Sequence, residues 1–66
     1  MKGRLTSKLL LHRTRASLTQ EELAQKVGVT RQTVIAIERG NYAPSVALAL
    51  MLAKVLKTTV EEIFTI

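Results

Sequence analysis

The chain has 66 residues, with ten Lys and Arg against five Asp and Glu, and 47% of its residues are hydrophobic. This length permits one small core of marginal stability, so we expect residues 1–66 to form a single domain to which oligomerisation would add buried area. The absence of cysteine and of any long apolar run excludes disulfides, thiolate metal sites and membrane insertion, and favours a cytoplasmic protein.

The positive charge is concentrated near the start of the chain. Half of the ten basic residues precede the first acidic residue, namely Lys2, Arg4, Lys8, Arg13 and Arg15. A net charge of +5 on so small a body predicts attraction to polyanions, with nucleic acid ahead of a membrane surface. The alternative is a basic, solvated segment that has no partner.

Five helical segments are expected, with no strand pattern between them. The first runs from about Leu5 to Ala16, where Leu5, Leu9 and Ala16 fall on or near one stripe. The second begins after Thr19, because Thr19 and Glu22 have the spacing of a capping box. The Thr19 hydroxyl and the Glu22 carboxylate can each accept a hydrogen bond from one free backbone N–H at the start of the helix.

A glycine ends each of the second and third predicted helices. Gly28 can adopt the positive φ that terminates the second helix, Thr30 is a suitable N-cap for the third, and Gly40 ends the third. Two short helices joined by a turn of a few residues have helix-turn-helix spacing. The residues expected to face the core are Leu23, Ala24, Val27, Val34 and Ile37.

Two further helices are predicted after the loop at residues 41–44. Ser45 is a good N-cap for a fourth helix that continues to about Leu56, and Thr59 with Glu62 forms a second capping box. The short terminal helix then brings more apolar residues to the core. The core residues expected from this part are Leu48, Leu52, Ala53, Leu56, Val60, Ile63 and Phe64. The predicted fold class is therefore all-α.

The stretch "LTQEELAQKVGVTRQTVIAIERGNYAPS" resembles the lambda-repressor and Cro-like helix-turn-helix transcription regulators, also called the xenobiotic-response-element family. The resemblance extends from about Leu9 to Phe64. It implies a compact five-helix domain whose third helix lies in the major groove of double-stranded DNA. Such domains usually bind a palindromic operator as one half of a symmetric homodimer. We expect a repressor, which would block the polymerase by occupying the operator.

No enzymatic function is expected. The chain shows no nucleophile beside a base, no set of metal ligands around its single His, and no glycine-rich loop that could hold a phosphate. We therefore predict no catalytic residue, no cofactor, no metal and no small-molecule ligand.

The start of the third helix carries side chains suited to reading bases. Arg pairs well with guanine O6 and N7, and Gln pairs with adenine N6 and N7; Arg31 and Gln32 are these two residue types. Thr33 could approach a thymine methyl group or a phosphate, whereas Ala36 can offer only an apolar contact. We expect Arg31 and Gln32 to carry most of the base readout, with a solvated polar helix start as the alternative.

A second set of residues is predicted to bind the DNA backbone. In the resembling repressors a Gln at the position of Gln20 bonds a phosphate, and the loop after the third helix meets the sugar-phosphate backbone. Tyr42 has an equally weighted alternative as a hydrophobic lid. The predicted phosphate-binding residues are Thr19, Gln20, Arg39, Asn41, Tyr42 and Ser45.

Two charged residues fall near the inward side of apolar helices. The resemblance implies that Arg13 of the first helix and Glu38 of the third form a salt bridge. His12 could be a pH-sensitive contact or a phosphate ligand, but we favour an exposed or half-packed side chain.

The fourth helix, "SVALALMLAKVL", is apolar around almost its whole circumference, which indicates a second buried surface in a domain this small. The simplest explanation is a homodimer contact. One alternative is a monomer with an apolar surface, and another is an antitoxin or other interaction protein that binds a partner here. The residues predicted for this surface are Ala47, Met51, Val55, Phe64 and Ile66.

Overall fold

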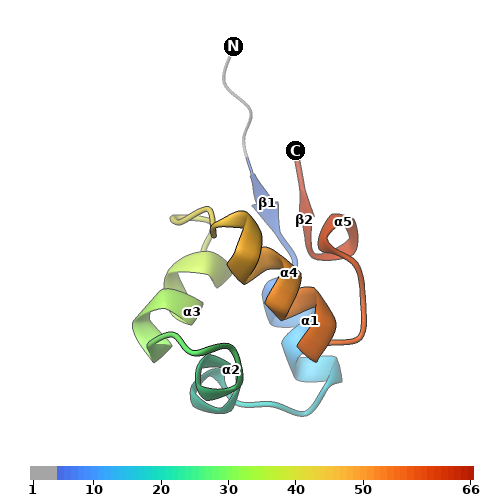
Figure 1. The fold of residues 1–66 in the computed structure, drawn as a ribbon. Helices are drawn as coiled ribbons and strands as arrows, with labels where there is room; N and C mark the ends of the chain where they lie inside the picture. The colour runs from blue at the N-terminus through green and yellow to red at the C-terminus, as the bar shows by residue number, and fades with distance from the viewer. Residues whose placement is uncertain (1–4) are drawn as a thin grey trace.

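The computed structural model describes residues 5–66 and confirms the predicted helical fold with a helix-turn-helix at its second and third helices. Within this range five helices pack around a common core, and two short strands lie side by side at one end (Figure 1). The elements in chain order are β1 (Thr6–Ser7), α1 (Leu9–Arg15), α2 (Gln20–Val27), α3 (Arg31–Glu38), α4 (Val46–Val55), α5 (Val60–Ile63) and β2 (Phe64–Thr65).

Local sequence signals set the starts of four helices. Each of α2 to α5 begins at a hydroxyl side chain that accepts a hydrogen bond from the backbone N–H three residues on; the caps are Thr19, Thr30, Ser45 and Thr59. At α2 the capping box is complete, because the Thr19 N–H also donates to Glu22 Oε1 over 2.8 Å. Hydrogen bonds from the backbone and hydroxyl of Thr19 lower the pKa of Glu22 below its ordinary value of 4.5.

The prediction that the chain contains no strand was wrong. β1 pairs with β2 in antiparallel register, with Thr6 opposite Thr65. The first helix consequently begins at Leu9 instead of near residue 5, and the Lys8 N–H donates to the Ile63 carbonyl over 2.7 Å. Strands of two residues are too short to show an alternating pattern, and this pairing joins opposite ends of the chain.

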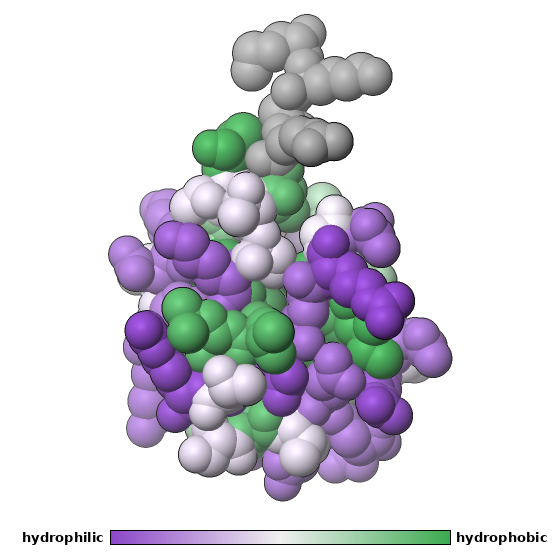
Figure 2. Space-filling view, turned by 180° about the vertical axis from the view of Figure 1, so that it is seen from behind, coloured by the Kyte–Doolittle hydropathy of each residue, from purple (hydrophilic) through white to green (hydrophobic). Residues whose placement is uncertain are grey.

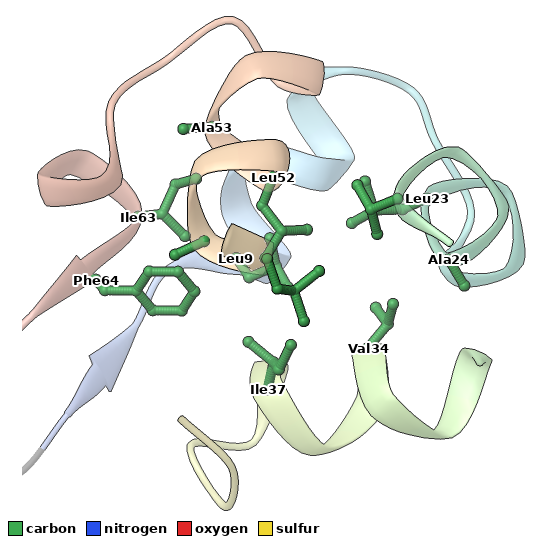
Figure 3. Packing of buried hydrophobic residues seen from close by; sticks show 12 residues of the cluster. Leu9, Leu23, Ala24, Val34, Ile37, Leu52, Ala53, Ile63 and Phe64 are labelled. Carbon is green, nitrogen blue, oxygen red and sulfur yellow. The ribbon is translucent and has the colours of Figure 1, made fainter. Parts of the chain in front are cut away.

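The core lies where the five helices converge. Figure 3 shows Leu9 and Leu52 near its centre, with Leu23, Val34 and Ile37 directed toward them from α2 and α3. Apart from the partly buried Leu56 and Val60, the predicted core residues of α2 to α5 and the chain end are all buried, and Ala49 joins them with 8% of its surface exposed. Ala16 is a further correction: it caps α1 and is exposed, because the helix ends before Ala16 can turn inward.

Within residues 5–66, no helix combines the length and the apolar character needed to cross a bilayer. The same residues bring together no group of three or more His, Cys, Asp or Glu side chains that could hold a metal ion.

Candidate nucleic-acid interface

A tight turn between α2 and α3 sets the position of the candidate interface. Gly28 ends α2 with φ 75°, a left-handed backbone conformation that costs glycine little, and the Val29 N–H closes the turn on the Ala24 carbonyl over 3.0 Å. Thr30 then caps α3 through the Thr33 N–H. The first residues of α3 therefore emerge at the surface immediately after the turn.

The four predicted base-reading residues differ in accessibility. Arg31 and Gln32 are exposed at the first two positions of α3, whereas Thr33 and Ala36 are half-buried. The Thr33 hydroxyl lies 3.1 Å from that of Thr30, so the two hydroxyls share a hydrogen bond. Arg31 and Gln32 are the more accessible pair, and they are adjacent in the chain.

The amide of Gln20 connects α2 to both ends of α3. Its Nε2 donates to Glu38 Oε1 over 2.9 Å, and its Oε1 accepts from Arg31 Nε over 3.3 Å. Because one half of the amide donates and the other accepts, these two contacts fix its orientation. Gln20 thus holds Arg31 against the body of the domain.

Arg13 and Glu38 make the contact that the resemblance implied. Arg13 Nε lies 2.5 Å from Glu38 Oε2, and the two side chains are 11% and 7% exposed. Arg13 Nη1 also donates to the Leu18 carbonyl over 2.7 Å. A continuous series of polar contacts therefore runs from α1 through Glu38 and Gln20 to Arg31. In residues 5–66 no buried side-chain nitrogen or oxygen lacks a hydrogen-bond partner.

The candidate phosphate-binding residues lie on two segments that flank α3. Thr19 and Gln20 lie at the start of α2, and the Thr19 and Ser45 hydroxyls already accept backbone hydrogen bonds as caps. Arg39, Asn41 and Tyr42 are exposed in the connection between α3 and α4, and Tyr42 keeps 46% of its surface exposed. The early basic residues Lys2 and Arg4 lie outside the described residues.

Two surface hollows flank the hydrogen bond between Gln20 and Arg31. Both hollows are lined by these two residues; the first adds Arg13, Thr19 and Glu21, and the second adds Leu10, Ile35, Glu38 and Arg39. Leu10, which is 51% exposed, is not among the residues predicted for this surface. An apolar residue at an outward position of a short helix is a weak signal, since many such residues are ordinary surface.

The predicted partner surface is only partly exposed. Met51 and Ile66 have 44% and 91% of their surfaces exposed, and Ala47 is also exposed. Val55 and Phe64 are less accessible than the others, because Val55 is partly buried against the core and Phe64 is only 9% exposed. The most exposed large apolar residues of α4 are Val46 and Leu50, at 77% and 58%. A helix that is apolar around almost its whole circumference has no broad polar face that would reveal its rotation.

His12 is half-buried and connects α1 to α5. Its Nε2 lies 3.2 Å from the Glu62 carbonyl oxygen, within hydrogen-bond distance. This contact with a residue fifty positions away places His12 in the packing between helices.

The arrangement of α2, the turn and α3 defines a helix-turn-helix protein. A family model described as helix-turn-helix matches residues 10–63, and the chain therefore belongs to the lambda-repressor and Cro-like helix-turn-helix family of transcription regulators. This family consists of regulators and is not an enzyme family.

Individual members of this family are similar to the chain over most of its length. The chain is 50% identical over 60 residues to the uncharacterized transcriptional regulator MJ0272 of Methanocaldococcus jannaschii, and the match covers 91% of each chain. It is 50% identical over 52 residues to the uncharacterized regulator YgzD of Bacillus subtilis, covering 79% of each chain.

Solved structures show the same fold. The restriction-modification controller protein C.AhdI from Aeromonas hydrophila has a TM-score of 0.75 at 37% identity, with 82% of each chain covered. The clp gene regulator ClgR from Corynebacterium glutamicum has a TM-score of 0.76 at 26% identity, and the match covers 82% of this chain and 57% of that one.

Proposed function

We propose that this chain forms a single domain that represses transcription by binding a palindromic operator as a homodimer, with α3 in the major groove of each half-site. The observation that carries the proposal is the pair of exposed, adjacent side chains of Arg31 and Gln32 at the start of α3. A major groove admits one α-helix, and the first residues of the inserted helix reach the base edges. Such a regulator would act in the cytoplasm, on the chromosome.

The hydrogen bonds of Arg31 suit it to guanine. Its Nε donates to Gln20, and this leaves both terminal Nη groups to face the groove. Two Nη donors match guanine O6 and N7, while the neighbouring Gln32 amide matches adenine N7 and N6. We therefore infer a guanine contact and an adenine contact at nearby positions of the half-site, each contributing about 1–3 kcal/mol of discrimination.

The backbone contacts would hold this helix in register. Arg39, Asn41 and Tyr42 supply a cation, an amide and a hydroxyl on the segment after α3, and Thr19 and Gln20 lie at the partly positive N-terminus of α2. Ser45 would add a hydroxyl at the start of α4. Occupation of the operator by two copies would then block access of RNA polymerase.

The proposal is tested by selecting bound duplexes from a random pool. The wild-type chain should enrich one half-site; Arg31→Ala should relax preference at one position and Gln32→Ala at a nearby position, each by about 1–3 kcal/mol. Gln25→Ala is a matched control, because Gln25 is also an exposed helical glutamine but lies on α2.

A backbone contact should behave differently. Arg39→Ala should weaken binding to all duplexes about equally and reduce the slope of log K against log salt by about 1. Enrichment of no sequence by the wild-type chain would contradict the sequence-specific function.

A further inference from the structure

An apolar groove of about 520 Å³ lies on the surface beside α4, at a site separate from the base-reading residues. The α3–α4 connection, α4, α5, β2 and the residue before β1 contribute to it. Its lining includes Leu5, Val46, Leu50, Val60, Glu61 and Phe64. Neither Arg31 nor Gln32 lines it. A macromolecule could therefore fill the groove while α3 stays uncovered.

A ridge of exposed apolar side chains borders this groove. Val46 and Leu50 line the groove and are 77% and 58% exposed, so they project from the surface. Their four-residue spacing continues to Lys54, the one charged residue within Val46–Val55. Seen from behind in Figure 2, the surface carries several groups of apolar residues with hydrophilic residues between them.

The ridge and the groove adjoin on one face, as a contact between two identical copies requires. A two-fold contact places the same patch of both copies against each other, so the patch must be complementary to itself. If two α4 helices cross in antiparallel directions at Leu50, Lys54 of the second copy lies opposite Val46. Glu61 lines the same groove as Val46, so each Lys54 would approach the other copy's Glu61.

We propose that a second copy of this chain occupies the groove, with the two α4 helices antiparallel and centred on Leu50. Each copy places its Val46 and Leu50 against the apolar lining of the other, and two Lys54–Glu61 pairs close the rim. The inference deepens the proposed function, since it assigns the surface that would join the two halves of the DNA-binding homodimer.

The first test measures the oligomeric state of the full chain without DNA, by sedimentation equilibrium from low to high micromolar concentration. The wild-type chain should dimerise, and Leu50→Glu should raise the dimer dissociation constant by at least about 30-fold, as expected for a central contact residue. The matched control is Leu11→Glu, because Leu11 is a 44% exposed leucine on α1 and does not line the groove. This control should leave the dissociation constant unchanged.

The second test exchanges the charges. Lys54→Glu and Glu61→Lys should each weaken the dimer, and the double variant should restore it toward the wild-type dissociation constant. Both side chains are exposed, so circular dichroism should show the native fold in every variant. The antiparallel arrangement would be overturned if the double variant dimerised no more tightly than the single variant with the higher dissociation constant.

Two other outcomes would overturn the proposal: a wild-type chain that stays monomeric at high micromolar concentration, or a dimer insensitive to Leu50→Glu. A monomer would also favour a different partner protein for this face. Duplex selection distinguishes this failure from failure of the proposed function, because a monomer that still enriches one half-site retains base reading.

Discussion

At the scale of single residues, Glu38 connects the interior of the domain to its candidate DNA-binding surface. One carboxylate oxygen contacts Arg13 Nε, and the other accepts from the Gln20 amide that holds Arg31. A side chain in the core is thereby coupled to one that would read a base. The geometry of Arg31 consequently depends on α1 and α2 as well as on α3.

The Arg13–Glu38 pair gives a testable prediction. Arg13→Ala or Glu38→Ala should each lower the free energy of unfolding by about 3–5 kcal/mol, because each leaves the other charge buried and unpaired. The double variant should lose much less than the sum of the two. Urea unfolding of the four proteins in a double-mutant cycle measures this coupling, and a coupling energy near zero would show that the contact contributes nothing.

At the scale of secondary-structure elements, capping residues determine where α2 to α5 begin. The hydroxyl caps act on N–H groups only three residues away, so their effect is local and does not require the rest of the fold. The capping box of α2 also has an electrostatic component, because the lowered pKa of Glu22 means that folding favours its ionised form.

The stabilising effect of Glu22 should depend on pH. A carboxyl group whose pKa is lower in the folded state stabilises the fold above its unfolded pKa, here 4.5, and loses this effect as pH falls through the folded pKa. Glu22→Gln keeps the capping hydrogen bonds without the charge, so its melting temperature should lie below the wild-type value at pH 7. The difference should shrink as pH falls below 4.5.

Thermal melts across this pH range measure that effect. Glu21→Gln is the control, since Glu21 lies in the same turn but the box is formed by Thr19 and Glu22. A difference between wild type and Glu22→Gln that stays constant with pH would contradict the electrostatic role of Glu22.

At the scale of the whole molecule, stability depends on a few large side chains. Leu52 is fully buried and lies near the centre of the core in Figure 3. Domains have about 0.05–0.15 kcal/mol of stability per residue, so a chain this short has little to lose. Because a chain this short has little stability of its own, an additional buried surface between two copies would stabilise its fold.

Leu52→Ala should therefore lower the free energy of unfolding by about 2–5 kcal/mol, a large share of the total. Leu11→Ala, at a 44% exposed position of α1, should change it by no more than about 0.5 kcal/mol. Urea unfolding at one fixed protein concentration compares the two variants, because the stability of a self-associating chain depends on concentration. Equal losses would contradict the assigned core.

The amino-acid sequence by itself determined the elements whose signals are local. Thr19, Thr30, Ser45 and Thr59 predicted the helix starts, Gly28 and Gly40 predicted the ends of α2 and α3, and the structure has both glycines at positive φ. The adjacent Arg31 and Gln32 also indicated the candidate base-reading surface, because the donor and acceptor groups that pair with bases follow from residue type alone.

Tertiary structure decided what depends on contacts between distant residues. It paired Thr6 with Thr65 and joined Gln20 to Glu38 and Arg31. It also buried Phe64 and partly buried Val55, while it exposed Val46 and Leu50. Two-residue strands have no period, and a helix that is apolar around almost its whole circumference has no distinct apolar stripe to set its rotation. Packing of α4 against α2 and α5 fixed which of its faces remained outside.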